Sequence, residues 1–345
     1  MPHQAPEGID RGGVEAWFEA NVADVTLPLE FERISGGRSN LTFSVTDAAG
    51  RRWALRRPPL GKGLTSAHDV GREHRVMSAL APTEVPVPPT VGLCADEAVN
   101  GAPFFVMEFV EGPVLRTQQL ALESFAEGQR LEIGERVADT LVAIHAVDPD
   151  GVGIGDLGRK QDYVARQLHR WHGQWEKSKT RDVPLVDDVH ARLAARIPDQ
   201  GRATIVHGDY RLDNMILSSE GEIAAVVDWE LCTLGDPLAD VGMLLVYWGE
   251  PGDELIPLGD MPTTAPGFPS RDEVKARYAE LSGRDLSEID FYVALGHWKL
   301  AVILQGIIAR VAAGQYGKDE DAAYESLELV ERLAEAADEA ERRLG

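Results

Sequence analysis

The first third of the chain carries short apolar or alternating runs of the length that β-strands have. Polar residues, Gly or Pro bound each run, so five strands are predicted, at 29–35, 41–46, 52–57, 90–95 and 103–109. A helical pattern over 67–81 separates the third strand from the fourth, and a short amphipathic helix is predicted around Val14 to Phe18. Residues 94–97 are predicted as a turn.

From residue 113 onward, apolar positions recur at helical spacing. Helices are predicted at 117–124, 127–147, 160–177, 184–197, 237–248, 288–314 and 320–344. Three short apolar runs interrupt them as predicted buried strands, at 203–206, 215–217 and 223–227, and residues 249–269 are predicted as Pro- and Gly-rich loop. This order predicts an α+β fold with a small, mainly antiparallel β unit at 1–111 and a larger, mainly helical unit at 112–345.

Composition narrows the classes of partner. At 345 residues the chain is long enough for two domains, and 44 % hydrophobic residues can build a core. The formal net charge of −23 comes without a block of Lys or Arg. We therefore expect no nucleic-acid partner, because clustered cations supply the affinity for phosphate backbones. An acidic surface can serve a cationic substrate, but a solubilising role is the simpler interpretation.

The sequence also bears on membrane and redox chemistry. The N-terminal residues lack a basic segment followed by an apolar core, and no fully apolar run reaches the roughly 18 residues of a membrane helix. We expect no membrane partner and a cytoplasmic location. Cys94 and Cys232 stand far apart without metal-ligand spacing, so neither a disulfide framework nor a structural zinc site is predicted.

Three oxygen-bearing side chains stand at the ends of the predicted buried strands. Asp209 follows one strand, Asn214 precedes the next and Asp228 closes the third. Phosphoryl transfer needs such a set: one carboxylate to orient and deprotonate a hydroxyl, and an amide oxygen with a second carboxylate to hold Mg²⁺. These residues also have a purely structural interpretation, in which Asp209 caps a turn, Asn214 is an ordinary loop residue and Asp228 is a solvated residue at a strand end.

The spacing of these residues resembles a known family. The pattern H-G-D-x-x-x-x-N at 207–214, followed after a strand by D-W-E at 228–230, is similar to the aminoglycoside phosphotransferase and choline kinase superfamily, relatives of the protein kinases. The resemblance implies a two-lobed protein-kinase-like fold, with an N-lobe at 1–111 that binds nucleotide and a C-lobe at 112–345 that holds the catalytic loop, the metal site and the substrate site.

The resemblance assigns roles in the C-lobe. Asp209 would accept the proton of the acceptor hydroxyl, and His207 in the same catalytic loop would brace it through hydrogen bonds. Asn214 and Asp228 would hold Mg²⁺. Asp240 would stabilise the loop. The helix at 160–177 is a candidate for substrate contact, although its aromatic residues at helical spacing are also typical of a core.

The nucleotide site would lie on the N-lobe, with contacts from three segments and one helix. Its predicted residues are Gly36, Gly37, Ser39 and Asn40 in a Gly-rich turn, Ala54 and Arg56 on one strand face, Glu73 on the helix, and Met107, Glu108 and Val110 in the hinge. Without the resemblance, the glycines would indicate a hairpin, Glu73 would be interpreted as a solvated helix residue, and the hinge segment would be interpreted as a core strand. Arg56 stands where the family usually has Lys; Arg also binds phosphate, yet the departure leaves an inactive relative open.

The leading hypothesis is a small-molecule kinase that uses ATP and Mg²⁺ and acts on a hydroxyl, as a monomer or homodimer. Protein kinase activity is disfavoured because Gly208 replaces the usual Arg and no A-P-E segment follows. A nucleotide-binding scaffold is the second hypothesis, and a metal hydrolase is disfavoured because the histidines do not cluster. Segments at 56–62 and 166–171 resemble the branch associated with acyl-CoA dehydrogenases, which favours a hydroxyacyl-thioester acceptor over an aminoglycoside.

Overall fold

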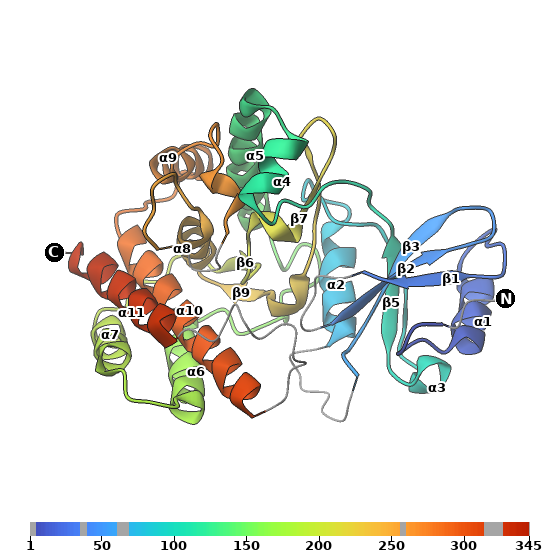
Figure 1. Ribbon diagram of the computed structural model, residues 1–345, viewed down its shortest axis with the longest axis horizontal. Coiled ribbons are helices and arrows are strands. Elements are labelled where there is room, and N and C mark those ends of the chain that lie inside the picture. Colours follow the sequence, from blue (N-terminus) through green and yellow to red (C-terminus); the bar gives the residue numbers. More distant parts are fainter. Residues whose placement is uncertain (1–4, 35–39, 61–68, 256–259, 314–326, 345) are drawn as a thin grey trace.

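Two parts make up the protein, a sheet-rich N-terminal part and a mainly helical C-terminal part, and they lie next to each other in Figure 1. The computed structural model describes residues 5–34, 40–60, 69–255, 260–313 and 327–344. The arrangement confirms the predicted α+β, two-lobed class.

The N-terminal part is built on a five-stranded sheet in which all neighbouring strands are antiparallel. Its strands lie in the order β1-β2-β3-β5-β4. Their bounds are β1 Glu30–Arg33, β2 Leu41–Thr46, β3 Arg52–Arg57, β4 Thr90–Cys94 and β5 Phe104–Glu108. Helices α1 (Arg11–Asn21), α2 (Val70–Leu80) and α3 (Glu97–Asn100) accompany the sheet. The five predicted strands are therefore confirmed, each within a few residues of its predicted ends.

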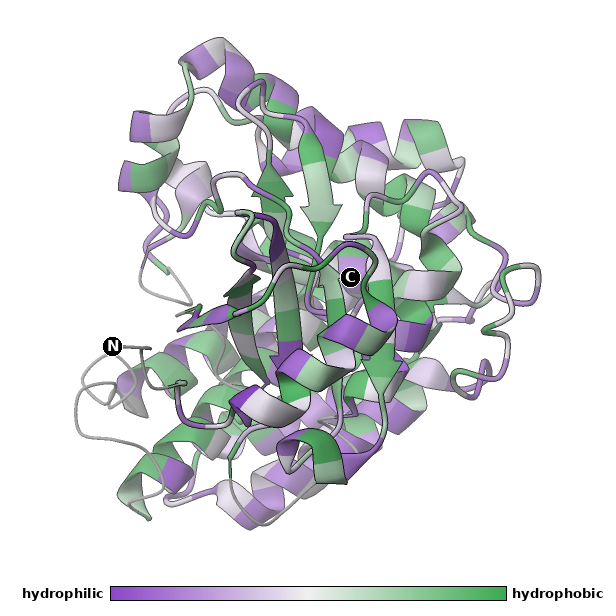
Figure 2. Ribbon diagram, turned by 90° about the vertical axis from the view of Figure 1, so that its right-hand side faces the viewer, coloured by the Kyte–Doolittle hydropathy of each residue, from purple (hydrophilic) through white to green (hydrophobic). Residues whose placement is uncertain are grey.

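Side-chain alternation divides this sheet into two faces. Trp53 and Leu55 on β3 pack in one cluster with Phe18 of α1. Ala54 belongs to the other cluster, together with Met107 of β5, its cross-strand neighbour. Because successive strand residues point to opposite faces, Ala54 and Arg56 share the second face, as predicted. In Figure 2 the strands are largely hydrophobic, which fits a sheet covered on both sides.

The C-terminal part consists of helices that enclose two small sheets. Its helices are α4 Gln118–Ser124, α5 Glu127–Ala146, α6 Tyr163–Ser178, α7 Pro184–Ala195, α8 Leu238–Tyr247, α9 Arg271–Ser282, α10 Ile289–Ala312 and α11 Leu327–Arg342. Strand β6 (Thr204–Val206) pairs with β9 (Thr233–Gly235), and β7 (Met215–Leu217) pairs with β8 (Ile223–Val226). Single 3-10 turns lie at Leu212–Asn214, Trp229–Leu231 and Pro262–Thr264.

Helix α10 runs through this part and packs against α6, α7, α8 and α11. By length and composition it could span a membrane, with a mean hydropathy of 1.4 over its most apolar window, and 67 % of that window is buried inside the protein. The sequence prediction considered only unbroken apolar runs, and polar residues such as Lys299 and Gln305 interrupt this one, so the helix was not identified as long and apolar enough. The burial is that of a core helix.

Three elements escaped the sequence prediction. Residues 97–100 form helix α3, directly after the residues predicted as a turn at 94–97; Asp96 caps the helix and accepts a hydrogen bond from the Ala98 amide. Strand β9, in the segment that follows Asp228, was not predicted. Helix α9 carries a capping box between Ser270 and Glu273, but it buries only Val274 and Tyr278, so its apolar signal is weak.

The segment that joins the two parts passes close to β7. The Leu217 amide donates a hydrogen bond of 3.0 Å to the Pro113 carbonyl. A Cβ atom on Gly112 would lie only 1.9 Å from the Leu217 carbonyl oxygen, so only glycine fits at this crossing. The predicted boundary between residues 111 and 112 falls in this connection.

Close helix packing generates a stability prediction. A Cβ on Gly242 of α8 would meet the Tyr292 backbone of α10 at 2.5 Å, whereas a Cβ on Gly173 of α6 meets nothing within 4 Å. We expect Gly242→Ala to lower the free energy of unfolding by about 1–3 kcal/mol through overpacking. The matched control Gly173→Ala should raise it by about 0.5–1 kcal/mol, since alanine favours the helix. Urea denaturation of both variants checks this; equal effects would contradict the packing.

Candidate active site

One buried carboxylate, that of Asp240, fixes the backbone of the loop after β6. Asp240, in the first turn of α8, accepts hydrogen bonds from the amides of His207 (2.6 Å) and Gly208 (2.8 Å). Gly208 has a φ of 88°, a conformation that glycine adopts without strain. Asp240 therefore fixes the loop's backbone at the point where the chain turns toward Asp209, in agreement with its predicted stabilising role.

A second buried contact keeps Asp240 charged. His145 of α5 lies 3.4 Å from the Asp240 carboxylate through Nε2, and its Nδ1 lies 2.8 Å from the Tyr278 hydroxyl. Burial opposes the charge of Asp240, but the hydrogen bond from His145 and the loop contacts outweigh it and lower the pKa of Asp240. Burial lowers the pKa of His145, because it disfavours the charged imidazolium. The neutral ring can then donate a hydrogen bond to Asp240 and accept one from Tyr278.

His207 bridges two segments of the site with its ring. Its Nε2 lies 3.1 Å from the Val227 carbonyl, and its Nδ1 accepts a hydrogen bond of 3.3 Å from the Asp209 amide. The residue is fully buried and packs on the Trp229 ring at a centroid distance of 4.6 Å. Both ring nitrogens contact backbone groups, so the geometry fits bracing and leaves no nitrogen for proton transfer.

The three predicted catalytic and metal-binding residues lie together. The Asn214 side-chain amide donates to the Asp209 carbonyl (2.8 Å) and to Asp209 Oδ2 (3.0 Å). The Val227 amide donates to the Asn214 carbonyl at 2.9 Å, which ties Asn214 to the residue before Asp228. Because the Asn214 nitrogen faces Asp209, its oxygen Oδ1 is the atom able to bind a cation.

Asp228 adopts an unusual backbone conformation at the end of β8. Its φ of 65° and ψ of 55° lie in the left-handed region, which only a few non-glycine residues adopt. A 3-10 turn at Trp229–Leu231 follows at once. Strain of this kind gathers at functional sites, where surrounding structure holds it in place.

Arg56 links the N-terminal sheet to this site through three carboxylates. Its Nε lies 2.7 Å from Glu73 Oε2, and its Nη2 lies 2.5 Å from Asp228 Oδ1 and 3.8 Å from Glu230 Oε2. Burial disfavours the charged guanidinium, but Glu73, Asp228 and Glu230 outweigh that effect and raise the pKa of Arg56. The predicted pairing of Arg56 with Glu73 is present, and Glu73 is almost fully buried.

The remaining predicted nucleotide contacts are placed as follows. Gly36, Gly37 and Ser39 lie outside the described residues. Asn40 is buried, and its amide donates to Glu230 Oε2 at 3.2 Å. Within the described part of the chain, Asn40 Oδ1 is a buried oxygen without a hydrogen-bond partner.

The predicted hinge lies at the end of β5. Met107 pairs with Ala54 across the sheet on the face that carries Arg56. Glu108 is exposed, and its amide donates to the Pro89 carbonyl at 2.8 Å. Val110, two residues further on, is half-buried.

Two residues beside Asp209 escaped the sequence prediction. Tyr247 of α8 hydrogen-bonds with the Asp209 carboxylate, and burial together with that charge raises the pKa of Tyr247 well above its usual range. Lys299 of α10 donates to the Gly208 carbonyl at 3.2 Å and lies 5.6 Å from the centre of the Trp171 ring. Burial lowers the pKa of Lys299, although Asp209 and Asp240 counteract it. The sequence signal that could have identified Lys299 is the presence of a lysine within an otherwise apolar helix.

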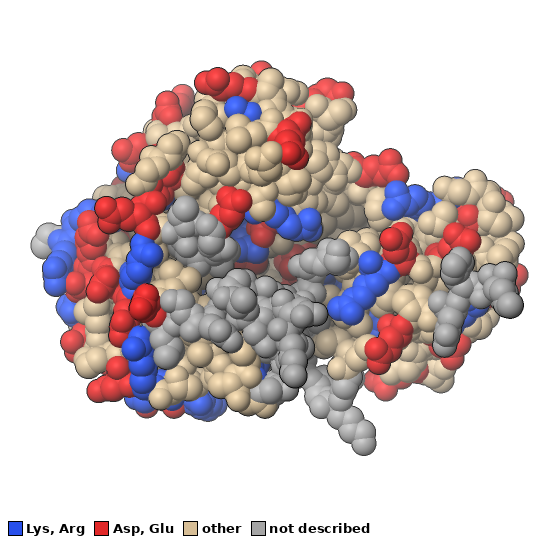
Figure 3. Space-filling view, in the orientation of Figure 1, with Lys and Arg blue, Asp and Glu red and all other residues tan. Residues whose placement is uncertain are grey.

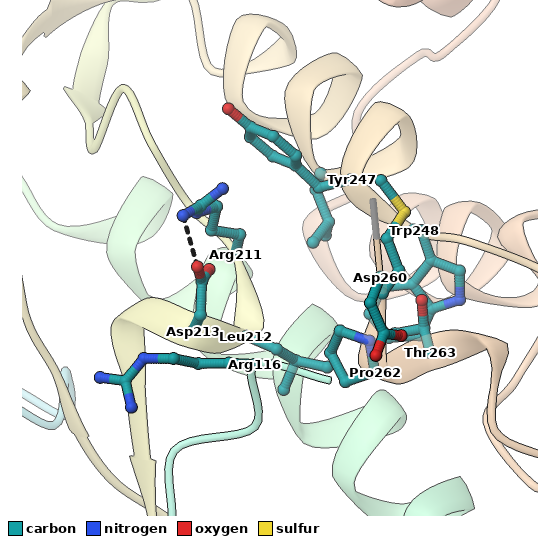
Figure 4. A pocket seen from close by; sticks show the side chains of 11 residues that line it. Arg116, Arg211, Leu212, Asp213, Tyr247, Trp248, Asp260, Pro262 and Thr263 are labelled. Carbon is teal, nitrogen blue, oxygen red and sulfur yellow. Dashed lines mark ion pairs between the residues drawn. The ribbon is translucent and has the colours of Figure 1, made fainter. Parts of the chain in front are cut away.

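A cavity of about 160 Å³ opens next to the catalytic loop. Arg116, Arg211 and Asp213 line one side, and Tyr247, Asp260 and Thr263 are among the residues that line the other. Figure 4 shows Arg211 turned toward Asp213, with which it forms an ion pair. Acidic and basic side chains are interspersed over the face that Figure 3 shows, so the net charge of −23 does not make this face uniformly acidic.

Loss of the Asp240 charge should release the loop. Asp240→Asn replaces one of two accepting oxygens with an amino group, which would face a backbone N–H. Each buried group left unpaired costs about 1–3 kcal/mol. We expect a lower melting temperature and faster amide hydrogen exchange at residues 207–208. The control Asp139→Asn removes a partly exposed ion pair with Arg277 and should cost at most about 1 kcal/mol; an equal loss in both variants would contradict the assignment.

Comparison with known proteins agrees with this geometry. A sequence model described as "Phosphotransferase enzyme family" matches residues 30–292. A solved structure of a candidate aminoglycoside phosphotransferase from Ralstonia eutropha superposes with a TM-score of 0.82 at 33 % identity, over 97 % of this chain and 99 % of that one. Choline kinase from Cryptosporidium parvum shares the fold, with a TM-score of 0.67 at 13 % identity over 97 % and 96 % of the two chains.

The relatives also include much longer proteins. Acyl-CoA dehydrogenase family member 10 of Mus musculus is 35 % identical over 316 residues, which cover 90 % of this chain but only 29 % of that protein. The chain thus corresponds to less than a third of that relative. The predicted resemblance, including the branch associated with acyl-CoA dehydrogenases, is confirmed. The match over residues 30–292 shows that the chain belongs to the phosphotransferase enzyme family.

Proposed function

We propose that the protein transfers the γ-phosphoryl group of ATP to a hydroxyl group of a small molecule. The observation that carries this proposal is the convergence of Asp209, Asn214 and Asp228 at adjoining strand ends. Side-chain hydrogen bonds join Asn214 to Asp209, and a backbone hydrogen bond joins Asn214 to Val227, the residue before Asp228. Aminoglycoside phosphotransferases of the same fold have been solved with ATP and streptomycin or with AMP-PNP and hygromycin B, which supports a nucleotide as co-substrate.

Each residue has a chemical role in this proposal. Asp209 accepts the proton of the acceptor hydroxyl, held in position by Asn214 and by the brace of His207. Asn214 and Asp228 offer an amide oxygen and a carboxylate, the hard ligands that Mg²⁺ prefers, so these two would hold the ion. Mg²⁺, when bound, neutralises charge on the phosphates. Asp228 has a second carboxylate oxygen besides the one bonded to Arg56.

In this proposal Arg56 binds the phosphates of the nucleotide. Glu73 anchors its Nε and Thr42 lies 3.3 Å from its Nη1, so the guanidinium is oriented from the N-terminal side. Its contact with Asp228 occupies the place where phosphates and Mg²⁺ would come together. Nucleotide binding would exchange this ion pair for phosphate contacts, which a planar guanidinium can make in a bidentate manner.

A hydroxyacyl-CoA-like molecule is the acceptor we favour. The relatives named as acyl-CoA dehydrogenase family members support an acyl thioester. The cavity beside the catalytic loop adds a second argument, because Arg116 and Arg211 balance Asp213 and Asp260 there. A polycationic aminoglycoside would require an excess of carboxylates, which these balanced charges do not supply.

Turnover on a panel of acceptors tests the proposal. Purified protein is given Mg-ATP with hydroxyacyl-CoA esters, aminoglycosides, choline-like alcohols and sugars, and ADP formation is followed. We expect hydroxyacyl-CoA turnover that falls by about a hundredfold or more in Asp209→Asn, because the base is lost, and that disappears in Asp228→Ala. Binding of ATP without turnover on any acceptor would favour a nucleotide-binding scaffold, and turnover on aminoglycosides alone would favour an antibiotic kinase.

Lys299 provides a second test at the same loop. Its ammonium group supports the Gly208 carbonyl and adds positive charge near Asp209. Lys299→Met should lower kcat by about tenfold or more, because a fixed charge beside the reacting groups is lost, with KM for ATP unchanged. Lys299→Arg should keep most of the rate. An unchanged kcat in the Met variant, with an unchanged melting temperature, would exclude this role.

A further inference from the structure

Helices α6 and α7 lie side by side (Figure 1), and three side chains of types that bind metals meet between them. His172 and Glu176 are four residues apart on α6 and therefore share one helix face. Asp187 stands in the first turn of α7. One ligand atom from each of the three residues lies within 4.8 Å of the others.

The distances suit a small cation. His172 Nε2 lies 3.1 Å from Asp187 Oδ1. Two ligands bound to one tetrahedral zinc ion at about 2.0–2.2 Å lie roughly 3.3–3.6 Å apart, so this pair needs to separate by only a few tenths of an ångström. Glu176 must move closer, and it can: it is exposed, and its ion pair with Lys179 lies at the surface and is worth about 0–1 kcal/mol.

The surroundings hold the first two ligands in place. Trp175 donates its Nε1 hydrogen to Asp187 Oδ2 at 3.3 Å, which orients the carboxylate. The His190 ring of α7 stacks on the His172 ring at a centroid distance of 3.9 Å and an interplanar angle of 7°. His190 in turn stacks on the buried Trp298 of α10 at 5.4 Å. Support of this kind raises metal affinity, because the ligands need little rearrangement.

We propose that His172, Glu176 and Asp187 bind a divalent transition-metal ion of the Zn²⁺ class, which clamps α6 to α7. One imidazole nitrogen and two carboxylate oxygens suit Zn²⁺ better than Mg²⁺, which prefers oxygen ligands alone. The clamp would fix α6, the helix that holds Trp171 against Lys299. The site is separate from the residues proposed to bind Mg²⁺.

Calorimetric titration of the tag-free, chelator-treated protein with ZnCl₂, without nucleotide, tests this proposal. We expect one ion per chain and a higher melting temperature, since an ion that binds only the folded state stabilises it. His172→Ala and Glu176→Gln should each weaken binding by about tenfold or more. His169→Ala, an exposed histidine on the same helix, should leave the affinity unchanged.

Each outcome decides the proposal independently of phosphotransferase activity. Binding lost in both variants and kept in the control supports the site. No binding overturns it, and an affinity that either variant leaves unchanged overturns it as an adventitious ion only. Glu176→Gln guards against a folding artefact, because an exposed side chain can be exchanged without disturbing the stack of His172 on His190.

Discussion

The active-site geometry depends on the carboxylate of Asp240, which accepts hydrogen bonds from two consecutive backbone amides at the turn of the catalytic loop. This buried charge fixes the loop backbone, and the His207 ring adds a second anchor by contacting the Val227 carbonyl, just before Asp228. The two anchors act on backbone atoms. The loop can therefore present Asp209 and Asn214 in a fixed relation to Asp228, although the residues come from different strands.

Charge also couples the two parts of the protein. Arg56 lies on the sheet, Glu73 on α2, and Asp228 and Glu230 after β8, and all four meet in one cluster. One guanidinium among three carboxylates leaves an excess of negative charge, which Mg²⁺ would reduce. The cluster joins the sheet and α2 to the segment that follows β8. Helices α6 and α10 add Trp171 and Lys299 on the other side of the loop.

Much of this could be predicted from the sequence, since its strongest signals were local. Short apolar strands next to Asp209, Asn214 and Asp228 indicated both the strand ends and the chemistry, and the alternation in β3 indicated the face of Arg56. Helix α9 was missed because only Val274 and Tyr278 are buried, so tertiary packing and a capping box define it more than periodicity does. Tyr247 and Lys299 were missed because they approach Asp209 from distant helices, and no local pattern encodes that approach. The nucleotide contact of Asn40 stays a prediction; its side chain donates to Glu230, which lies 190 residues further along the chain.

The proposed function rests on a magnesium–nucleotide site formed by Arg56, Asn214 and Asp228. A crystal structure of the protein with Mg²⁺ and AMP-PNP tests it most directly. We expect Asn214 Oδ1 and Asp228 to ligate the ion. We expect the Arg56 guanidinium to leave Asp228, now 2.5 Å away, for phosphate oxygens while it keeps its contact with Glu73. A structure in which the nucleotide binds elsewhere, or in which Arg56 stays on Asp228 and no ion touches Asn214, would contradict it.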